Sequence, residues 1–254
     1  MKTALTIAGS DPTGGAGLQA DLKIFNSLGV HGLSVATSLT AQNTIGVDSV
    51  LPVEAGFIEA QIITLLNDIR PDALKTGMIY SKEAVSVLVK TVRGFSLDNL
   101  VIDPVTVSSS GRPLMEEGAL DVLQRELFPL ARLITPNLYE ASALSGINVE
   151  DEESMEAAAV ILRKTGPEVV IITGGHLEDQ TLDLIYENGK FHRLRGKKIK
   201  GEFHGTGCAF SAAIAAYLAK GLSPLHAAEK AKGFVHEAIL KARSLGKGMK
   251  ILYV

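Results

Sequence analysis

The single cysteine of this 254-residue chain follows a glycine turn at the expected start of a helix. Cys208 comes directly after Gly205, Thr206 and Gly207 in the stretch GEFHGTGCAFSAAIAAYLAKG. The first N–H groups of a helix lack intrahelical partners, and the helix dipole adds partial positive charge there. Because glycines let the backbone fold closely around an anion, these four residues can form a cradle for a phosphate or an oxyanion.

The same environment lowers the pKa of a cysteine thiol. We therefore expect the pKa of Cys208 to lie closer to neutrality than in a free cysteine, so that its sulfur can accept a proton from a substrate hydroxyl. The motif alone also fits a small buried core cysteine beside a tight turn, and this alternative stays open at this point.

A second candidate motif, Asn137-Leu-Tyr-Glu140, follows a short expected strand. An asparagine with a glutamate three residues later is typical of a capping box, in which each side chain accepts a hydrogen bond from the other residue's backbone N–H. A further carboxylate, Asp103, stands at the end of the expected strand NLVIDPV. Asp103-Pro104 is also a common way to start a turn.

Short apolar runs alternate with amphipathic stretches along most of the chain. Strands are expected at 2–9, 32–40, 72–78, 99–105, 132–136, 169–175 and 181–194, and helices at 18–28, 55–69, 81–92, 114–127, 152–164 and 224–243, with further helices opening at Asn137 and at the cysteine. Asn188-Gly189 predicts a hairpin within 181–194. This alternation indicates one domain over 1–254 with a largely parallel sheet covered on both faces, and such sheets bind ligands beyond the carboxyl ends of their strands.

Composition limits the class of protein. Hydrophobic residues make up 46% and charged residues 21% of the chain, which is typical of a globular protein, and the net charge of -3 offers no general attraction to nucleic acid. One cysteine excludes an intramolecular disulfide and fits a reducing compartment. No apolar run reaches the roughly 18 residues of a membrane helix, so we expect a cytoplasmic protein without membrane or nucleic-acid partners.

The chain resembles the hydroxymethylpyrimidine and phosphomethylpyrimidine kinases of the ribokinase-like superfamily. The resemblance rests on HGTGCAFSAAIAAYLAKG, the N-terminal AGSDPTGGAGLQADLK and SLTAQNT, which occur in the family's order. It implies a three-layer α/β/α sandwich with a mostly parallel central sheet, and phosphorylation by ATP and Mg²⁺ of 4-amino-5-hydroxymethyl-2-methylpyrimidine and its monophosphate. Relatives are commonly dimers, so the resemblance also implies a homodimer.

The resemblance also implies roles for individual residues. Gln42 would read the aminopyrimidine, because an amide offers both donors and an acceptor. The substrate pocket would further include Gly9, Asp11, Ala16, Met78 and Val105. Cys208 would be the base and Gly205, Thr206 and Gly207 the phosphate cradle. Asn137 and Lys232 would lie near the nucleotide, and Glu140 and Asp103 near Mg²⁺.

One position departs from the family pattern: Thr173 stands where many relatives carry a phosphate-contacting lysine. A threonine supplies no charge, so a non-catalytic pyrimidine-binding protein stays open as an alternative. A pyridoxal or pyridoxine kinase of the same branch and a covalent thiol enzyme, with His204 or His176 beside Cys208, are further alternatives. The basic run from Arg193 to Lys200 is expected to be a solvated strand face or a rim that attracts phosphorylated substrates.

Overall fold

The computed structural model describes residues 1–108, 111–175 and 180–254, so His176 lies outside the described residues. Its described strands form a nine-stranded sheet in which β3 and β8 run against the other seven. The order across the sheet is β3 (Val47–Pro52), β2 (His31–Gln42), β1 (Thr3–Ser10), β4 (Ala73–Thr76), β5 (Leu100–Ile102), β6 (Leu133–Ile134), β7 (Val169–Gly174), β8 (Gln180–Glu187) and β9 (Lys190–Lys197).

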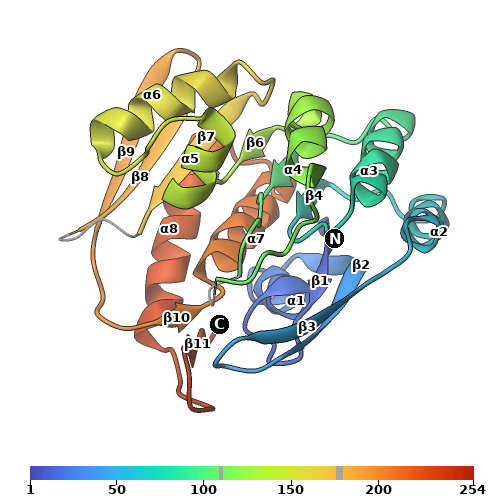
Figure 1. Ribbon diagram of the computed structural model, residues 1–254, viewed down its shortest axis with the longest axis horizontal. Coiled ribbons are helices and arrows are strands. Elements are labelled where there is room, and N and C mark those ends of the chain that lie inside the picture. The colour runs from blue at the N-terminus through green and yellow to red at the C-terminus, as the bar shows by residue number, and fades with distance from the viewer. Residues whose placement is uncertain (109–110, 176–179) are drawn as a thin grey trace.

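Helices cover both faces of the sheet (Figure 1). Alternate residues of β1 show why: Leu5 and Ile7 join one hydrophobic cluster, and Ala4 joins the other. The first cluster packs α2 (Ala55–Leu66), α3 (Lys82–Gly94), α5 (Leu138–Ser145) and α6 (Glu152–Arg163) on the sheet, and the second packs α1 (Gly17–Ser27), α7 (Thr206–Ala219) and α8 (Pro224–Leu240). The three-layer sandwich with a mostly parallel sheet is therefore confirmed.

Several local predictions are also confirmed. Asn188 and Gly189 both have positive φ, at 51° and 75°, and join β8 to β9 as a hairpin. The helix expected from residue 81 is also present as α3, and the Ser81 side chain caps it by accepting a hydrogen bond from Ala84 N–H. The sequence thus predicted the β8–β9 hairpin and the start of α3 correctly, because the turn and capping residues there favour the same structure as the apolar pattern.

One local prediction was wrong, and three strands were not predicted. The helix expected over 114–127 begins only at Ala119, because Gly118 adopts a left-handed conformation (φ 77°), and it runs as α4 (Ala119–Val122), a π-helical turn (Leu123–Leu127) and a 3₁₀ turn (Phe128–Leu130). The edge strand β3 was not predicted, and neither was the short parallel pair β10 (Phe203–His204) and β11 (Lys250–Ile251). Within the three described ranges, no helix combines the length and apolar character needed to cross a membrane.

Candidate active site

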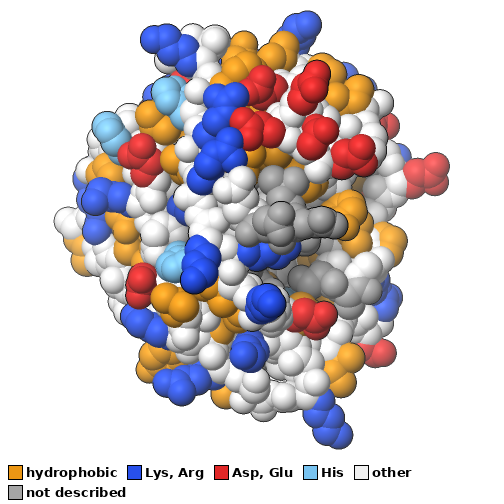
Figure 2. Space-filling view, turned by 90° about the vertical axis from the view of Figure 1, so that its left-hand side faces the viewer, with side chains coloured by type: hydrophobic (Ala, Val, Ile, Leu, Met, Phe, Trp, Pro, Cys, Tyr) orange, Lys and Arg blue, Asp and Glu red, His pale blue; other side chains and the backbone are white. Residues whose placement is uncertain are grey.

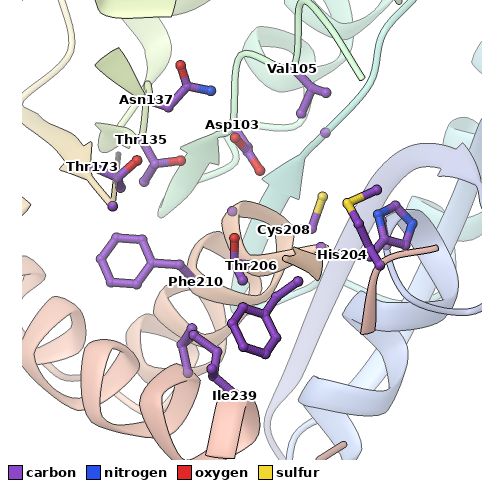
Figure 3. A pocket seen from close by; sticks show the side chains of 18 of the residues that line it. Asp103, Val105, Thr135, Asn137, Thr173, His204, Thr206, Cys208, Phe210 and Ile239 are labelled. Atoms are coloured by element: carbon purple, nitrogen blue, oxygen red, sulfur yellow. The ribbon is translucent and has the colours of Figure 1, made fainter. Parts of the chain in front are cut away.

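The carboxyl ends of the parallel strands open into a cleft of about 2100 Å³. This exceeds the roughly 300–1000 Å³ that one drug-sized ligand occupies, so the cleft can hold two substrates side by side. In Figure 3, Thr135, Asn137 and Thr173 lie toward one side of the cleft and His204 toward the other, with Asp103, Thr206 and Cys208 between them. All the predicted site residues line this cleft: Gly9, Asp11, Ala16, Gln42, Met78, Asp103, Val105, Asn137, Glu140, Gly205, Thr206, Gly207, Cys208 and Lys232.

The glycine turn is locked against the N-terminal loop. Gly205 is the residue before α7 and has a φ of 81°, and a Cβ atom there would overlap the carbonyl oxygen of Gly15. Gly17, at the start of α1, likewise has positive φ, and a Cβ there would overlap the Gly9 carbonyl oxygen. Glycine is therefore required at both positions, and the first turns of α1 and α7 meet beside Cys208.

The prediction that the pKa of Cys208 shifts toward neutrality was wrong. Burial raises the pKa of its thiol to about 12, although Lys75 and the Gly17 N–H both act to lower it. Asp103 and Asp21 add negative charge and raise it further. Cys208 keeps some exposed surface, but its sulfur lies in dense surroundings with carboxylates nearby, and these outweigh the helix dipole.

A fully buried ion pair lies beside this cysteine and was not predicted from the sequence. Lys75 Nζ in β4 lies 2.9 Å from Asp21 Oδ2 in α1, and both side chains have no exposed surface. Thr6 Oγ1 donates to the same Asp21 oxygen at 2.5 Å. The available signal was a lysine inside the apolar strand ALKT and an aspartate on the apolar face of the helix that begins at Gly17.

Two buried carboxylates, Asp103 and Glu140, line the cleft. Burial and the charge of Asp103 raise the pKa of Glu140 to about 8, and burial likewise raises the pKa of Asp103 despite Lys75 and the Ser211 hydroxyl, which donates to it at 2.9 Å. A nearby cation would relieve this repulsion. Two carboxylates are a donor set that Mg²⁺ accepts, because this ion takes few protein ligands and completes its shell with water and phosphate oxygens.

The capping box of Asn137 and Glu140 is confirmed. Asn137 Oδ1 accepts from Glu140 N–H and Glu140 Oε2 accepts from Asn137 N–H, each at 3.0 Å. Both residues also line the cleft, so capping fixes the carboxylate where a metal ion could use it. Thr173 pairs with Asp183 across the β7–β8 ladder. Lys232 reaches the same Asp183 carboxylate at 2.8 Å, so it is largely buried and paired rather than a solvated surface residue.

The other part of the cleft carries the residues expected to bind a ring. Asp11 accepts hydrogen bonds from Thr13 and from Ala16 N–H, and its Oδ2 lies 2.8 Å from His204 Nε2, so its carboxylate holds the loop together. His204 Nε2 in turn lies 3.3 Å from the Gln42 amide nitrogen. A Cβ on Gly9 would lie 2.6 Å from Ser38 Oγ and 3.2 Å from Met78 Sδ, so there is little room for a side chain at this position.

The basic run on β9 is engaged with acidic residues of α6. Arg193 forms ion pairs with Glu152 and Glu156, and Arg195 pairs with Glu152 at 2.6 Å. Figure 2 shows Lys and Arg side chains beside acidic side chains on this face. Because Arg193 and Arg195 also line the cleft, they form part of its rim.

The strand order, the cleft beyond the carboxyl ends of the strands and the glycine turn at a helix start are those of the ribokinase-like α/β fold. Residues 11–252 match the family model described as phosphomethylpyrimidine kinase. The chain belongs to this family.

Individual relatives carry names that agree with this family. The chain is 43% identical to the hydroxymethylpyrimidine/phosphomethylpyrimidine kinase of Rhizobium meliloti, over 96% of this chain and 93% of that protein. It is also 43% identical to the thiamine biosynthesis bifunctional protein ThiED of Geobacter sulfurreducens, over 97% of this chain. The chain spans about half of that longer protein, 51%.

Solved structures show the same fold. A phosphomethylpyrimidine kinase from Clostridium difficile superposes with a TM-score of 0.84 at 38% identity, covering 94% of this chain and all of that one. The pyridoxal kinase of Staphylococcus aureus, in complex with AMP-PCP and pyridoxal, superposes with a TM-score of 0.91 at 35% identity, covering 99% of this chain and 93% of the other.

Proposed function

We propose that the chain acts as one kinase domain over residues 1–254 and transfers the γ-phosphoryl group of ATP to the hydroxyl of 4-amino-5-hydroxymethyl-2-methylpyrimidine, and then to the resulting monophosphate, in thiamine biosynthesis. The observation that carries the proposal is the cleft that joins Gln42 to the glycine turn Gly205–Cys208 in a member of the phosphomethylpyrimidine kinase family. The pyridoxal kinase neighbour that binds AMP-PCP supports ATP as the phosphoryl donor.

In this proposal the pyrimidine ring lies between Met78 and Val105, with its edge on the Gln42 amide. Gly9 and Ala16 close the loop over it, and Asp11 holds that loop through its bonds to Thr13 and His204. The ring's hydroxymethyl oxygen attacks the γ-phosphorus as the bond to the ADP oxygen breaks. Transfer of this kind requires mostly positioning of the reactants and stabilisation of charge. Fixed backbone N–H groups can therefore provide most of the stabilisation of the transition state.

The N–H groups of Gly205, Thr206, Gly207 and Cys208 would hold the transferring phosphoryl group. Asn137 and Lys232 would border the nucleotide, and Glu140 and Asp103 would hold Mg²⁺. When bound, this ion neutralises phosphate charge during transfer. With a pKa raised to about 12, Cys208 rests as a neutral thiol, so it can take the hydroxyl proton only where its thiolate form is stabilised.

A second candidate is a pyridoxal kinase activity, favoured by the similarity to a structure that holds pyridoxal. A panel with ATP and Mg²⁺, in which the phosphorylated products of the pyrimidine alcohol, its monophosphate and pyridoxal are resolved, separates the two. We expect a kcat/KM for the pyrimidine alcohol at least tenfold above that for pyridoxal. Phosphorylation of pyridoxal alone would assign the second activity. Binding of the pyrimidine without any ADP release would indicate a non-catalytic binding protein.

The same panel tests the covalent thiol alternative. Mass spectrometry of the protein during turnover should find no phosphoryl or acyl group on Cys208, whereas a trapped adduct would contradict a direct transfer.

We also propose that the chain forms a homodimer through the β2–β3 hairpin. Leu39 and Leu51 from the two paired strands, and Ile45 from the turn between them, are 49%, 66% and 62% exposed. A second copy would cover this apolar surface. Light scattering after chromatography should give the mass of a dimer, and Leu51→Asp should shift it to that of a monomer.

A further inference from the structure

The amide of Gln42 lies between two polar side chains of the cleft. Gln42 is the last residue of β2, and Thr40 stands two positions before it, so both side chains project from the same side of the strand. Thr40 Oγ1 lies 3.0 Å from Gln42 Oε1, and His204 Nε2 lies 3.3 Å from Gln42 Nε2. Each end of the amide therefore has one polar neighbour, and all three residues line the cleft.

The proton on His204 is placed by its contact with Asp11. Asp11 Oδ2 accepts hydrogen bonds from the Thr13 hydroxyl and from Ala16 N–H, so it is also an acceptor for His204 Nε2, which lies 2.8 Å away. The other ring nitrogen, Nδ1, is buried and has no hydrogen-bond partner among the described residues. A proton on Nδ1 would be buried without an acceptor, at a cost in free energy. The proton of a neutral His204 therefore belongs on Nε2.

This tautomer disfavours the amide nitrogen on the His204 side. Nε2–H of His204 and the amide NH₂ of Gln42 are both donors, so they would face each other at 3.3 Å without a hydrogen bond. The amide oxygen in that place would accept from His204 instead. The oxygen and nitrogen of an amide occupy nearly the same space, so hydrogen bonds decide between its two orientations.

The Thr40 hydroxyl favours the same orientation. Thr40 Oγ1 lies 2.9 Å from the Ser10 carbonyl oxygen and 3.0 Å from the amide of Gln42. Its one proton cannot be donated to both. If the amide nitrogen lies on the Thr40 side, the hydroxyl donates to Ser10 and accepts from Gln42. Each of these donors then has an acceptor.

We propose that Thr40 and His204 are positioning residues that hold the Gln42 amide with its nitrogen toward Thr40 and its oxygen toward His204, and that this orientation selects the ring the cleft accepts. The amide keeps one N–H and one oxygen lone pair for a ligand, a donor beside an acceptor. It pairs with a ring that offers the complementary edge, such as an amine beside a ring nitrogen. The proposal deepens the proposed function and rests on it for the identity of the ring.

The direction of the pairing follows from the place of His204 in the chain. His204 directly precedes Gly205, so the amide oxygen lies on the side of the glycine turn. In the proposed reaction the hydroxymethyl group points to this turn, and the 4-amine is the ring substituent next to it. The 4-amine therefore meets the amide oxygen of Gln42, and the neighbouring ring nitrogen meets its N–H. A 4-oxo pyrimidine has the reverse edge, a carbonyl beside a ring N–H, and is rejected.

The orientation can be tested without a ligand. Long-range ¹H–¹⁵N NMR of the histidine rings distinguishes a proton on Nε2 from one on Nδ1, and the signal missing in His204→Phe identifies His204. At pH 8 we expect His204 to carry a proton on Nε2. An unprotonated Nε2 would leave the Gln42 nitrogen as its donor and would overturn the proposal.

The selection is tested with two matched ligands, the pyrimidine alcohol and its 4-oxo counterpart, whose dissociation constants are measured by calorimetry. The unmodified protein should prefer the amino compound by about 10²-fold or more. Thr40→Val has nearly the same volume but no acceptor for the amide, so the preference should fall about tenfold, with tighter binding of the 4-oxo compound. Thr40→Ser restores the hydroxyl and should restore the preference.

His204→Phe should reduce the preference in the same way, and the Thr40 variants decide the matter if His204→Phe fails to fold. Equal weakening of both ligands would indicate a merely structural role and overturn the proposal, as would an unchanged preference in Thr40→Val. The expected preferences without any ADP release would support the selection by Gln42 and refute the kinase function. If neither ligand binds the unmodified protein, the proposed substrate is refuted, while the NMR measurement still decides the orientation of the amide.

Discussion

Gly205→Ala should disable the anion cradle at its first residue. The new Cβ would lie 1.8 Å from the Gly15 carbonyl oxygen, and the backbone φ of 81° is itself unfavourable for alanine. The left-handed conformation costs about 1–2 kcal/mol. Because carbon and oxygen require roughly 3.2 Å, the turn must also move by more than an ångström away from the N-terminal loop, which brings the expected loss of stability to about 3 kcal/mol.

The same displacement should reduce kcat. Removing one well-placed oxyanion donor typically costs 10²–10³ in rate, and here the whole turn moves. The assay measures urea unfolding and the ATP-dependent phosphorylation of the pyrimidine alcohol on the same preparation.

Gly146→Ala is the matched control. Gly146 has a φ of 75° at the end of α5, and a Cβ there would meet nothing within 4 Å. That variant should lose only about 1 kcal/mol and keep its kcat. If Gly205→Ala is no less stable than Gly146→Ala and turns over at the normal rate, then the contact between the two loops does not hold the cradle, and the reasoning fails.

Three further results are expected. Gln42→Leu should lower kcat/KM for the pyrimidine alcohol by about 10²-fold through lost ring recognition, measured against an unchanged kcat/KM for ATP at saturating alcohol. Burial acts to raise the pKa of Asp11, but hydrogen bonds from His204 and Thr13 hold it below its ordinary value. The ionised Asp11 carboxylate therefore stabilises the folded protein at pH values above the ordinary pKa. This stabilisation is lost as the pH falls through the lower pKa of the folded state. Asp11→Asn should therefore be less stable than the unmodified protein at pH 6, with the difference shrinking below about pH 4 in acid unfolding curves, and a constant difference would contradict this role. Glu140→Gln removes a carboxylate that could ionise to bind Mg²⁺ beside Asp103, so it should raise the Mg²⁺ concentration for half-maximal rate by about tenfold or more, whereas an unchanged Mg²⁺ titration would exclude Glu140 as a ligand.

The layers and most of the cleft could be predicted from sequence because local signals agreed with the fold. The buried strands, the Asn188-Gly189 turn and the capping box at Asn137 each carry their own residue pattern. Placement beyond the carboxyl ends of parallel strands then brought the separate motifs into one cleft.

The charges around Cys208 could not be predicted from the sequence. The helix start predicted a lowered pKa for Cys208, but the sequence does not say that Asp21, Asp103 and dense packing surround the sulfur. The ion pair with Lys75 joins residues 54 positions apart. The strand at 47–52 was missed for another reason: its residues are largely exposed and end in a proline, as edge strands allow, so it has no buried alternation.

A crystal structure of the protein with AMP-PCP and the pyrimidine alcohol tests the central claim most directly. We predict the γ-phosphate within hydrogen-bonding distance of the N–H groups of Gly205–Cys208, with the alcohol oxygen between it and the sulfur and the ring amine on Gln42. A nucleotide whose phosphates lie elsewhere in the cleft, with those N–H groups facing protein atoms, would contradict the account.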